Sequence, residues 1–311
     1  MPDANGLLPP QPGGDSVRET AVREPGGKGA RVDRISPRRS NNHTPDAAAR
    51  LFTDAISARE RFPRGLIQPL GSFRFSADAL LLAAFAVRRC LPDHGPERAA
   101  PALLDLGCGC GVVALACLLA CPSLRAVGVD IQSDLAAAAR ENAALLGLET
   151  RFAAHAADIT AQTPPYPPGS FAVAAANMPY RRPGSGRLPR SAARKAALFA
   201  EENTIPAFLS AAASALATGG NLALVYPWDE RDILLSALPE HGFSPQEILP
   251  VSTGTATGSR CLLRAMRAGE ESRKGGGPLI LPPLALHQEK GTSYTEEALA
   301  FCPWLDSRPW T

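Results

Sequence analysis

Three glycines alternate with two cysteines directly after a short apolar run, in the sequence Leu103-Leu104-Asp105-Leu106-Gly107-Cys108-Gly109-Cys110-Gly111. Glycine allows a sharp turn and a close approach of the backbone to a ligand, and a following helix directs its first amides at that ligand. The spacing differs from the Gly-x-Gly-x-x-Gly of dinucleotide-binding loops, which disfavours a pyrophosphate ligand. A purely structural turn is the alternative. The residues that we assign to a ligand site here are Asp105, Gly107, Gly109 and Gly111.

Carboxylates stand at the ends of the next two expected strands. Asp130 follows Val127-Gly128-Val129, and Asp158 follows Ala156-Ala157. A carboxylate at the end of the second strand can accept hydrogen bonds from both hydroxyl groups of a ribose, whereas a solvated aspartate is the alternative. We assign both aspartates to the same ligand site, together with the apolar residues that follow them, Ile131 and Ile159.

The glycine loop resembles the S-adenosylmethionine-binding loop of class I methyltransferases. The resemblance implies that S-adenosylmethionine is the cofactor and that Asp105 lies near its methionine part. It also implies that Asp158 contacts the adenine amine of the cofactor, while Asp130 accepts the ribose hydroxyls.

The fourth expected strand ends in Asn177-Met178-Pro179-Tyr180, which looks like the Asn-Pro-Pro-Tyr signature of methyltransferases acting on adenine N6, guanine N2 or a glutamine amide. The lone pair of such a nitrogen is delocalised, so acceptors must hold both N–H bonds while the lone pair is directed at the methyl group. We expect the Asn177 side-chain oxygen and the Met178 main-chain carbonyl to accept them, and Tyr180 to stack on the base. Met178 replaces the first proline and keeps its carbonyl but not its fixed φ. We assign all four residues to catalysis, and Asn177 also to the cofactor site.

A run of basic residues follows this motif. Lys and Arg number 32 against 30 Asp and Glu, so the formal net charge of +2 provides no global field for a nucleic acid or a membrane. Residues 181–195, however, contain six basic residues and no acidic one. Beside the expected target site such a run favours contact with a phosphate backbone, with a solvated loop as the alternative. The residues that we assign to RNA binding are Arg181, Arg182, Arg187, Arg190, Arg194 and Lys195.

Strand-like and helix-like segments alternate through the middle of the chain. This alternation predicts an α/β fold with a doubly wound, mostly parallel, seven-stranded Rossmann-like sheet, whose ligand lies at the carboxyl ends of the strands. Gly147 and Gly219-Gly220 are expected to stop two of the helices. The expected strands are 102–106, 126–129, 151–156, 171–176, 222–226, 246–251 and 260–267, and the expected helices are 112–120, 133–146, 204–217 and 230–241.

Glycine and proline, 27 and 30 in number, make up nearly a fifth of the 311 residues. We expect residues 1–45 to be a disordered tail, 46–100 an N-terminal helix/hairpin cap, 101–268 the catalytic domain and 269–311 a Gly/Pro-rich tail. In the cap, a short helix precedes two short strands around a glycine turn between Leu66 and Phe75. Ser76 then caps a helix that runs to about Arg89.

The seven cysteines are an odd number in apolar surroundings, with no secretory signal, which favours reduced thiols in a cytoplasmic protein. Their spacing fits no structural zinc pattern, so no metal is expected. No apolar run approaches the length of a membrane span, so no membrane contact is expected. We expect a monomer.

From about Gly65 to Met266 the chain resembles the bacterial tRNA(Val) adenine-N6 methyltransferases, which modify adenosine 37. The shared features are the segment 71–82 ahead of the cofactor loop, the Asn-Met-Pro-Tyr motif and the arginine-rich run; the tail from Leu279 to Tyr294 is also similar. The resemblance implies a tRNA substrate and places Phe75 and Asp78 near the cofactor.

Two other functions stay open. Glutamine-N5 methyltransferases of translation release factors share the fold and the Asn-Pro-Pro-Tyr site, but they carry a folded helical domain ahead of the cofactor loop. The other is a non-catalytic RNA-binding protein with a relic cofactor pocket. The presence of every expected cofactor ligand disfavours it.

Overall fold

The computed structural model describes residues 47–72, 74–91, 102–179, 203–253, 256–269, 277–288 and 291–306, without the side chains of 47–53 and 256–258. The expected disordered tail, residues 1–45, lies outside these ranges. The helices are α1 (Ala47–Glu60), α2 (Ala77–Phe85), α3 (Val112–Ala120), α4 (Ser133–Leu145), α6 (Thr204–Ala215), α7 (Arg231–Glu240) and α8 (Glu296–Phe301), with the short helical turns η1 (Ala86–Cys90), η2 (Trp228–Glu230) and η3 (Pro303–Leu305). The strands are β1 (Ala102–Leu106), β2 (Arg125–Asp130), β3 (Phe152–Ala156), β4 (Phe171–Ala176), β5 (Leu216–Pro227), β6 (Phe243–Thr253), β7 (Ala256–Arg267), β8 (Leu279–Ile280) and β9 (Leu284–Ala285).

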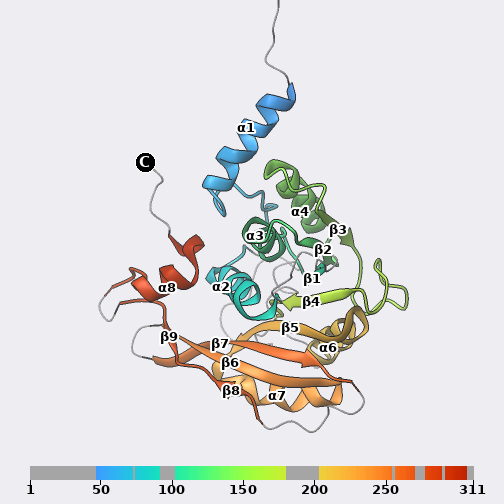
Figure 1. The fold of residues 1–311 in the computed structure, drawn as a ribbon, viewed down its shortest axis with the longest axis vertical. Helices are drawn as coiled ribbons and strands as arrows, with labels where there is room; N and C mark the ends of the chain where they lie inside the picture. Colours follow the sequence, from blue (N-terminus) through green and yellow to red (C-terminus); the bar gives the residue numbers. More distant parts are fainter. Residues whose placement is uncertain are drawn as a thin grey trace, which may run out of the picture. The chain divides into compact units, whose positions relative to one another are not determined.

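These strands form one sheet, in the order β3-β2-β1-β4-β5-β7-β6-β8, with β9 also paired to β6 (Figure 1). Strands β1 to β5 are parallel, and β7 runs antiparallel to both β5 and β6. The predicted seven-stranded, mostly parallel sheet is therefore confirmed as the body of the fold. The short strands β8 and β9 pair in parallel with β6 and add to that body.

Helices cover both faces of the sheet. Helices α2, α3 and α4 pack on one face, and α6 and α7 pack on the other (Figure 1). Because successive strand residues point to opposite faces, neighbours along a strand enter different cores. Leu103 belongs to the α2–α4 core and Leu104 to the α6–α7 core.

The end of α6 differs from the prediction. The helix ends at Ala215 and β5 begins at Leu216, so the expected stop Gly219-Gly220 lies inside a strand. A Cβ on Gly220 would lie 2.9 Å from the Ala217 carbonyl oxygen and 3.1 Å from that of Ala172. Gly220 therefore serves a close approach of backbone to backbone, and the extended chain of β5 ends the helix.

The predicted hairpin is also absent: the structure contains no strand in residues 61–72 or 74–76, which we call the rim loop. The glycine turn itself is present, with Gly71 at φ +86° and the Ser72 amide donating to the Pro69 carbonyl at 3.2 Å. The backbone of Ile67 is paired with a side chain instead of a strand. Its N–H donates to Asn142 Oδ1 at 2.7 Å, and its carbonyl accepts from Asn142 Nδ2 at 3.0 Å.

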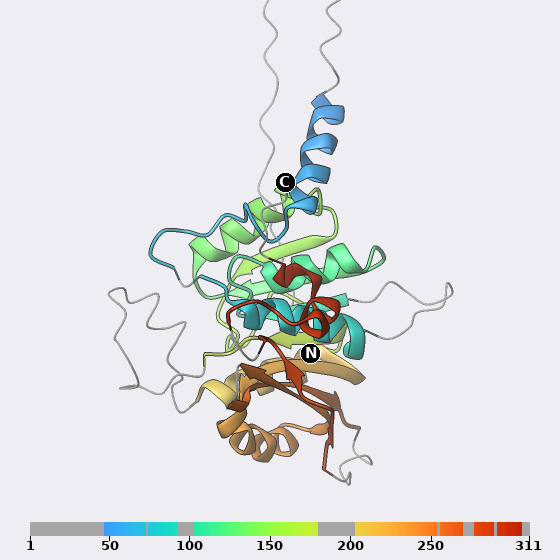
Figure 2. The ribbon, with the colours of Figure 1, turned by 90° about the vertical axis from the view of Figure 1, so that its left-hand side faces the viewer.

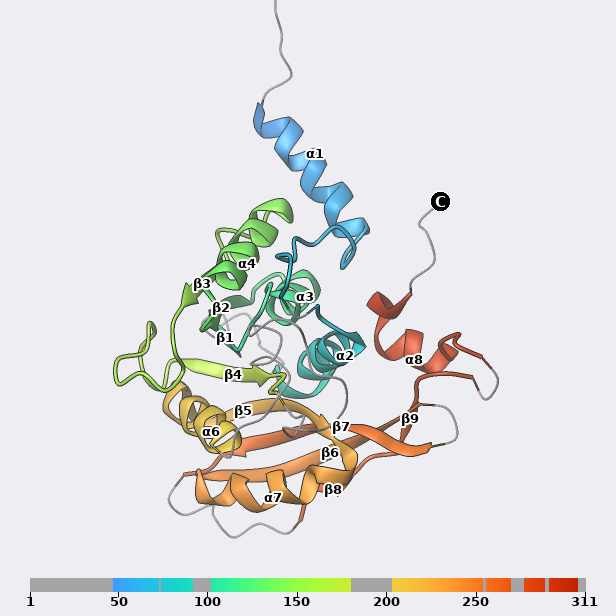
Figure 3. The same cartoon turned by 180° about the vertical axis from the view of Figure 1, so that it is seen from behind.

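The C-terminal segment packs against the cap, whereas the sequence predicted a Gly/Pro-rich tail. Figure 3 shows α8 beside α2. Arg88 donates to the carbonyls of Ala300 and Phe301 at 2.6 and 3.0 Å, and Cys302 Sγ lies 3.4 Å from the Leu80 carbonyl oxygen. No helix in the described ranges is both long and apolar enough to cross a membrane.

Candidate active site

The glycine loop joins β1 to α3 and is tied to the neighbouring strand β2. The amides of Gly107 and Cys108 both donate to the Val129 carbonyl, at 2.8 and 3.0 Å. Gly107, Gly109 and Gly111 have φ of +69°, +55° and +86°, values that side chains other than glycine rarely adopt. The three glycines are therefore required by the backbone conformation of the loop.

A cavity of about 450 Å³ opens at the carboxyl ends of the parallel strands, beside this loop. A Cβ on Gly109 would meet no atom within 4 Å, so the loop leaves space where a side chain would otherwise project. The structure brings ten of the sequence-predicted residues to the wall of the cavity: Asp105, Gly107, Gly109, Asp130, Ile131, Asp158, Ile159, Asn177, Met178 and Pro179.

Some predicted residues are placed elsewhere or are not described. Gly111 does not line the cavity; its missing side chain leaves room for α4, since a Cβ there would lie 3.1 Å from that of Ala139. Tyr180 and the whole basic run 181–195 lie outside the described residues.

Asp105 and Asp130 are both buried, with exposed fractions of 1 and 7 %. Asp105 Oδ2 accepts from the Ala114 amide at 3.1 Å, and burial raises the pKa of this carboxyl to about 7. Burial also raises the pKa of Asp130, although amides of Gln132 and Gly109, each 2.9 Å from a carboxylate oxygen, act in the opposite direction. The cavity therefore holds two carboxyl groups whose ionisation a bound cation would favour.

Asp158 has a different environment at the end of β3. It is exposed, and the amide and hydroxyl of Thr160 both donate to its Oδ1, at 2.8 and 2.7 Å. These hydrogen bonds lower the pKa of the carboxyl. Two apolar side chains accompany it on the wall, Ile159 and Ile131, and Ile131 is 66 % exposed although it is large and apolar.

The residues after β4 form another part of the wall. Met178 lines the cavity and is 1 % exposed, and it belongs to the α6–α7 core. Asn177 and Pro179 are half-buried. Within the described part of the chain, the Asn177 side chain makes no hydrogen bond, which leaves its amide available to a ligand.

The first turns of α2 and α6 complete the wall. Phe75, Ser76 and Asp78 come from the cap, as the resemblance implied for Phe75 and Asp78. Asp78 is held by an ion pair of 3.1 Å with Arg260 on β7. Sequence reasoning missed the residues at the start of α6, because nothing in their spacing marks them: Asn203, Thr204, Ala207 and Phe208. The ring of Phe208 lies 3.4 Å from where a Gly107 Cβ would stand.

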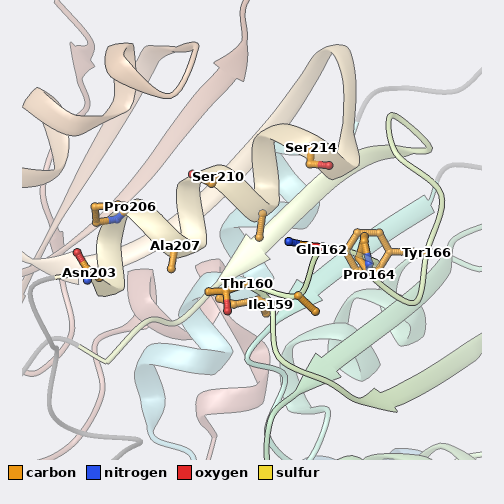
Figure 4. A pocket seen from close by; sticks show the side chains of 12 residues that line it. Ile159, Thr160, Gln162, Pro164, Tyr166, Asn203, Pro206, Ala207, Ser210 and Ser214 are labelled. Carbon is orange, nitrogen blue, oxygen red and sulfur yellow. The ribbon is translucent and has the colours of Figure 1, made fainter.

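A second hollow of about 430 Å³ continues from this cavity along α6 (Figure 4). Ile159, Thr160, Asn203 and Ala207 line both spaces. In Figure 4, Gln162, Pro164, Tyr166 and Ser214 lie further along the groove. No charged side chain is among its twelve lining residues.

The described residues contain no group of three or more His, Cys, Asp or Glu side chains that could hold a metal ion. Cys108 and Cys110 are both buried in the cavity wall. Burial raises the pKa of Cys110 to about 11 and also raises that of Cys108, so both groups are neutral thiols at physiological pH.

Comparison with known proteins relates this site to methyl transfer. A family described as a methyltransferase domain matches residues 103–220. A release factor glutamine methyltransferase of Caulobacter vibrioides is 39% identical over 84 residues, which are 24% of this chain and 29% of that protein. A tRNA1(Val) (adenine(37)-N6)-methyltransferase of Edwardsiella ictaluri is 29% identical over 205 residues, which are 65% of this chain and 75% of that protein.

Solved structures share the fold at low sequence identity. A predicted O-methyltransferase from Agrobacterium tumefaciens has a TM-score of 0.56 at 18% identity, covering 73% of this chain and 96% of that one. A Listeria monocytogenes protein assigned to the class I S-adenosylmethionine-dependent methyltransferases has a TM-score of 0.51 at 14% identity, covering 81% and 79%. These likenesses concern the Rossmann-like fold.

Proposed function

We propose that this chain, an S-adenosylmethionine-dependent methyltransferase of the class I fold, methylates the exocyclic N6 of an adenine in RNA, with tRNA adenosine 37 as the target. The observation that carries the proposal is the position of Asn177, Met178 and Pro179. They lie on the wall of the same cavity as the glycine loop, at the carboxyl end of β4.

The cavity fits the cofactor in size and chemistry. Its volume of about 450 Å³ is within the range of small-molecule sites, roughly 300–1,000 Å³. Asp105 would face the methionine part, Asp130 the ribose and Asp158 the adenine amine, while Ile131 and Ile159 offer apolar contact to a flat base. When bound, S-adenosylmethionine supplies a methyl group on a positively charged sulfur.

Residues of the chain would orient the target nitrogen. The Asn177 side-chain oxygen accepts one N–H of the exocyclic amine, and the Met178 carbonyl accepts the other. Met178 can keep this role in place of proline, because only its main-chain carbonyl is required and its position is on the cavity wall. No general base is required, since alignment of the amine can supply most of the rate.

RNA is favoured by charge and by similarity. The Edwardsiella relative covers the larger part of this chain, from which we infer a tRNA substrate. Pro179 and Asn203, the described residues on either side of segment 180–202, both line the cavity. The sequence of that segment contains the six basic residues, which supports contact with a phosphate backbone.

A release factor is the second candidate substrate. The Caulobacter relative has the higher identity, although over a shorter segment, and a glutamine amide presents two N–H bonds to Asn177 and Met178 as an adenine amine does. The third candidate function is that of a catalytically inactive RNA-binding protein. This function predicts no binding of S-adenosylmethionine.

Labelled S-adenosylmethionine separates these candidates. The protein is incubated with bulk tRNA, ribosomal RNA or release factors, and the methylated molecule and base are identified by mass. Label in adenine N6 of tRNA supports the proposal, whereas label only in release-factor glutamine contradicts it. Calorimetry measures cofactor binding by the wild type and by Asp130→Ala. No binding, or binding that Asp130→Ala does not weaken, would contradict any enzymatic function.

Asn177→Ala tests the role of the motif. We expect the variant to bind the cofactor but to transfer methyl about 100-fold more slowly, because an acceptor aimed at the reacting group is lost. Asn221→Ala is the matched control, since Asn221 lies on β5 and does not line the cavity. It should keep most of the activity. Equal rates for Asn177→Ala and the wild type would refute the role in holding the nitrogen.

A further inference from the structure

The rim loop carries positive charge beside the cavity. It contains Arg61, Arg64 and Arg74, and no acidic residue occurs between Glu60 and Asp78. Arg64 and Arg74 are exposed, and neither forms an ion pair in the described part of the chain. Phe75 and Ser76, at the end of the loop, line the cavity. The loop therefore brings two available guanidinium groups close to the proposed target site.

The same loop exposes an aliphatic side chain at a rigid turn. Leu70 is 99 % exposed, the largest exposed fraction among the exposed large apolar residues of the described chain. The turn is closed by two hydrogen bonds to the Pro69 carbonyl, from the Ser72 amide at 3.2 Å and the Ser72 hydroxyl at 2.7 Å. The turn therefore holds an apolar side chain in a fixed position, where a partner that removed it from water would gain binding free energy.

Hydrogen bonds fix the rim loop to the glycine loop between β1 and α3. Asn142 on α4 is fully buried and bonds both backbone groups of Ile67, and its Nδ2 also donates to the Cys110 carbonyl at 3.0 Å. Further along, the Phe75 amide donates to Gln68 Oε1 at 3.3 Å. Figure 2 shows the loop between α1 and α2 projecting from the α/β body. The loop is therefore held at both sides of its turn, and its turn is presented outward.

We propose that the rim loop is a second contact surface for the RNA, in which Leu70 packs against the base next to the target adenine and Arg64 and Arg74 contact phosphates. The inference rests on the proposed function and extends it. An enzyme that acts on a base must take it out of the stack, and an apolar side chain commonly occupies the space between the neighbouring bases. The combination of two arginines with an exposed aliphatic side chain favours RNA as the partner, because RNA presents phosphates beside apolar base faces.

The geometry allows this contact. Leu70 is five residues from Phe75, so its Cα lies no further than about 18 Å from that of a residue in the cavity wall. This distance corresponds to a few nucleotides at most. The turn therefore lies within a few nucleotides of the wall of the cavity that Asn177 also lines.

Leu70→Ala tests the packing contact against its expected partner. The substrates are an RNA stem-loop with the target adenine and two versions with an abasic site on one or the other side of it. On the intact RNA we expect kcat/KM to fall about tenfold, from lost apolar contact. On the RNA that lacks the contacted base, the variant and the wild type should be equal, because the partner of Leu70 is already missing.

Ile233→Ala is the matched control, because Ile233 is an exposed aliphatic residue on α7 with 46 % exposure. It should leave kcat/KM unchanged on all three RNAs. A uniform loss for Leu70→Ala on every RNA would indicate a purely structural effect and would overturn the inference, as would wild-type values throughout.

The arginines are tested by the salt dependence of RNA binding. Arg64→Gln with Arg74→Gln should lower the slope of log affinity against log salt by about 1.4, from about 0.7 per phosphate contact on a single strand. Arg125→Gln is the control, since Arg125 is exposed and begins β2, whereas the cavity lies at the carboxyl ends of the strands. An unchanged slope in the double variant overturns the phosphate contacts.

Failure of the inference and failure of the proposed function have different signatures. If the wild type methylates RNA and the rim-loop variants behave like it, only this inference is wrong. If the wild type methylates release factors and no RNA, the proposed function is wrong, and this inference falls with it.

Discussion

At the scale of single residues, the cavity is defined by carboxyl groups in unlike environments. Burial raises the pKa of Asp105 to about 7, whereas hydrogen bonds from Thr160 lower the pKa of exposed Asp158. At neutral pH, Asp158 is therefore ionised and Asp105 is partly protonated. The protonation of Asp105 should respond to a cationic ligand.

Asp105 should make stability depend on pH. Its folded pKa of about 7 lies above the 3.8 of an aspartate in the unfolded chain. The folded state therefore binds more protons between these values, and stability falls as pH rises through that window. The loss is absent below about pH 4 and complete above about pH 7. Denaturant unfolding of the ligand-free protein should show a fall of a few kcal/mol between about pH 4 and pH 7, reduced in Asp105→Asn. Parallel curves for both proteins would contradict this assignment.

Gly109→Ala, compared with Gly169→Ala, should distinguish the effect of backbone strain from the effect on ligand binding. Gly109 has φ +55°, and Gly169, in the loop before β4, has φ +63°; a Cβ would meet no atom within 4 Å at either position. Alanine should therefore destabilise both variants by about 1 kcal/mol. Only Gly109→Ala adds a methyl group beside the cavity, so only it should weaken cofactor binding, which calorimetry measures. Equal affinities in the two variants would contradict the placement of the cofactor.

At the scale of elements, a side chain takes the place of a strand. The alternating pattern between Leu66 and Phe75 predicts a hairpin, yet the backbone groups of Ile67 are satisfied by Asn142 on α4. A sequence pattern cannot show this, because Asn142 is 75 residues away from Ile67. The pairing of loop and helix also connects the cap with the carbonyl of Cys110 in the cofactor loop.

Asn142→Ala should therefore weaken both folding and cofactor binding. The variant leaves three backbone groups without partners, which we expect to cost about 2–4 kcal/mol of unfolding free energy. The loosened cofactor loop should lower the affinity for S-adenosylmethionine about tenfold in calorimetry on the folded fraction. Leu148→Ala is the control: Leu148 is 1 % exposed, so its truncation destabilises by a similar amount without touching the loop. Equal affinity losses in both variants would argue against a positioning role.

At the scale of the described molecule, the C-terminal segment completes the core over the cap. Leu286, Ala298, Cys302 and Leu305 are buried in the same core as α2 and α3. Trp304 meets the ring of Phe62 edge-on, with centroids 6.0 Å apart. Helix α2, whose start lines the cavity, is therefore covered by residues more than 200 positions later in the chain.

Removal of this segment should destabilise the protein. A chain that ends at residue 276 exposes the apolar side of α2, and we expect a thermal midpoint lower by 10 °C or more, or an insoluble product. A chain that ends at Asp306 is the control and should unfold like the full protein. Unchanged unfolding of the shorter chain would show that the segment contributes little.

Local patterns were sufficient for the body of the fold and for most of the cavity. The periodicity of apolar residues placed β1, α3 and β4 at their observed bounds, because each is a buried element with a strong local signal. Ten of the residues proposed for cofactor and target line one cavity, because parallel strands end at one edge of the sheet. The end of α6, the rim loop and the C-terminal segment were not predicted, because each is decided by contacts between distant residues.

The sequence by itself determined the class of fold, the strand ends that carry the carboxylates and the turn that requires glycine, since these depend on periodicity and on backbone sterics. Only the tertiary structure decided which side chains close the cavity. Phe208 reaches the glycine loop from α6, Asp78 is held by Arg260 from β7, and Asn142 joins the rim loop to Cys110. Partners of this kind are selected by proximity in the folded chain, where a buried polar group must find a hydrogen bond, and separation along the sequence does not encode that choice.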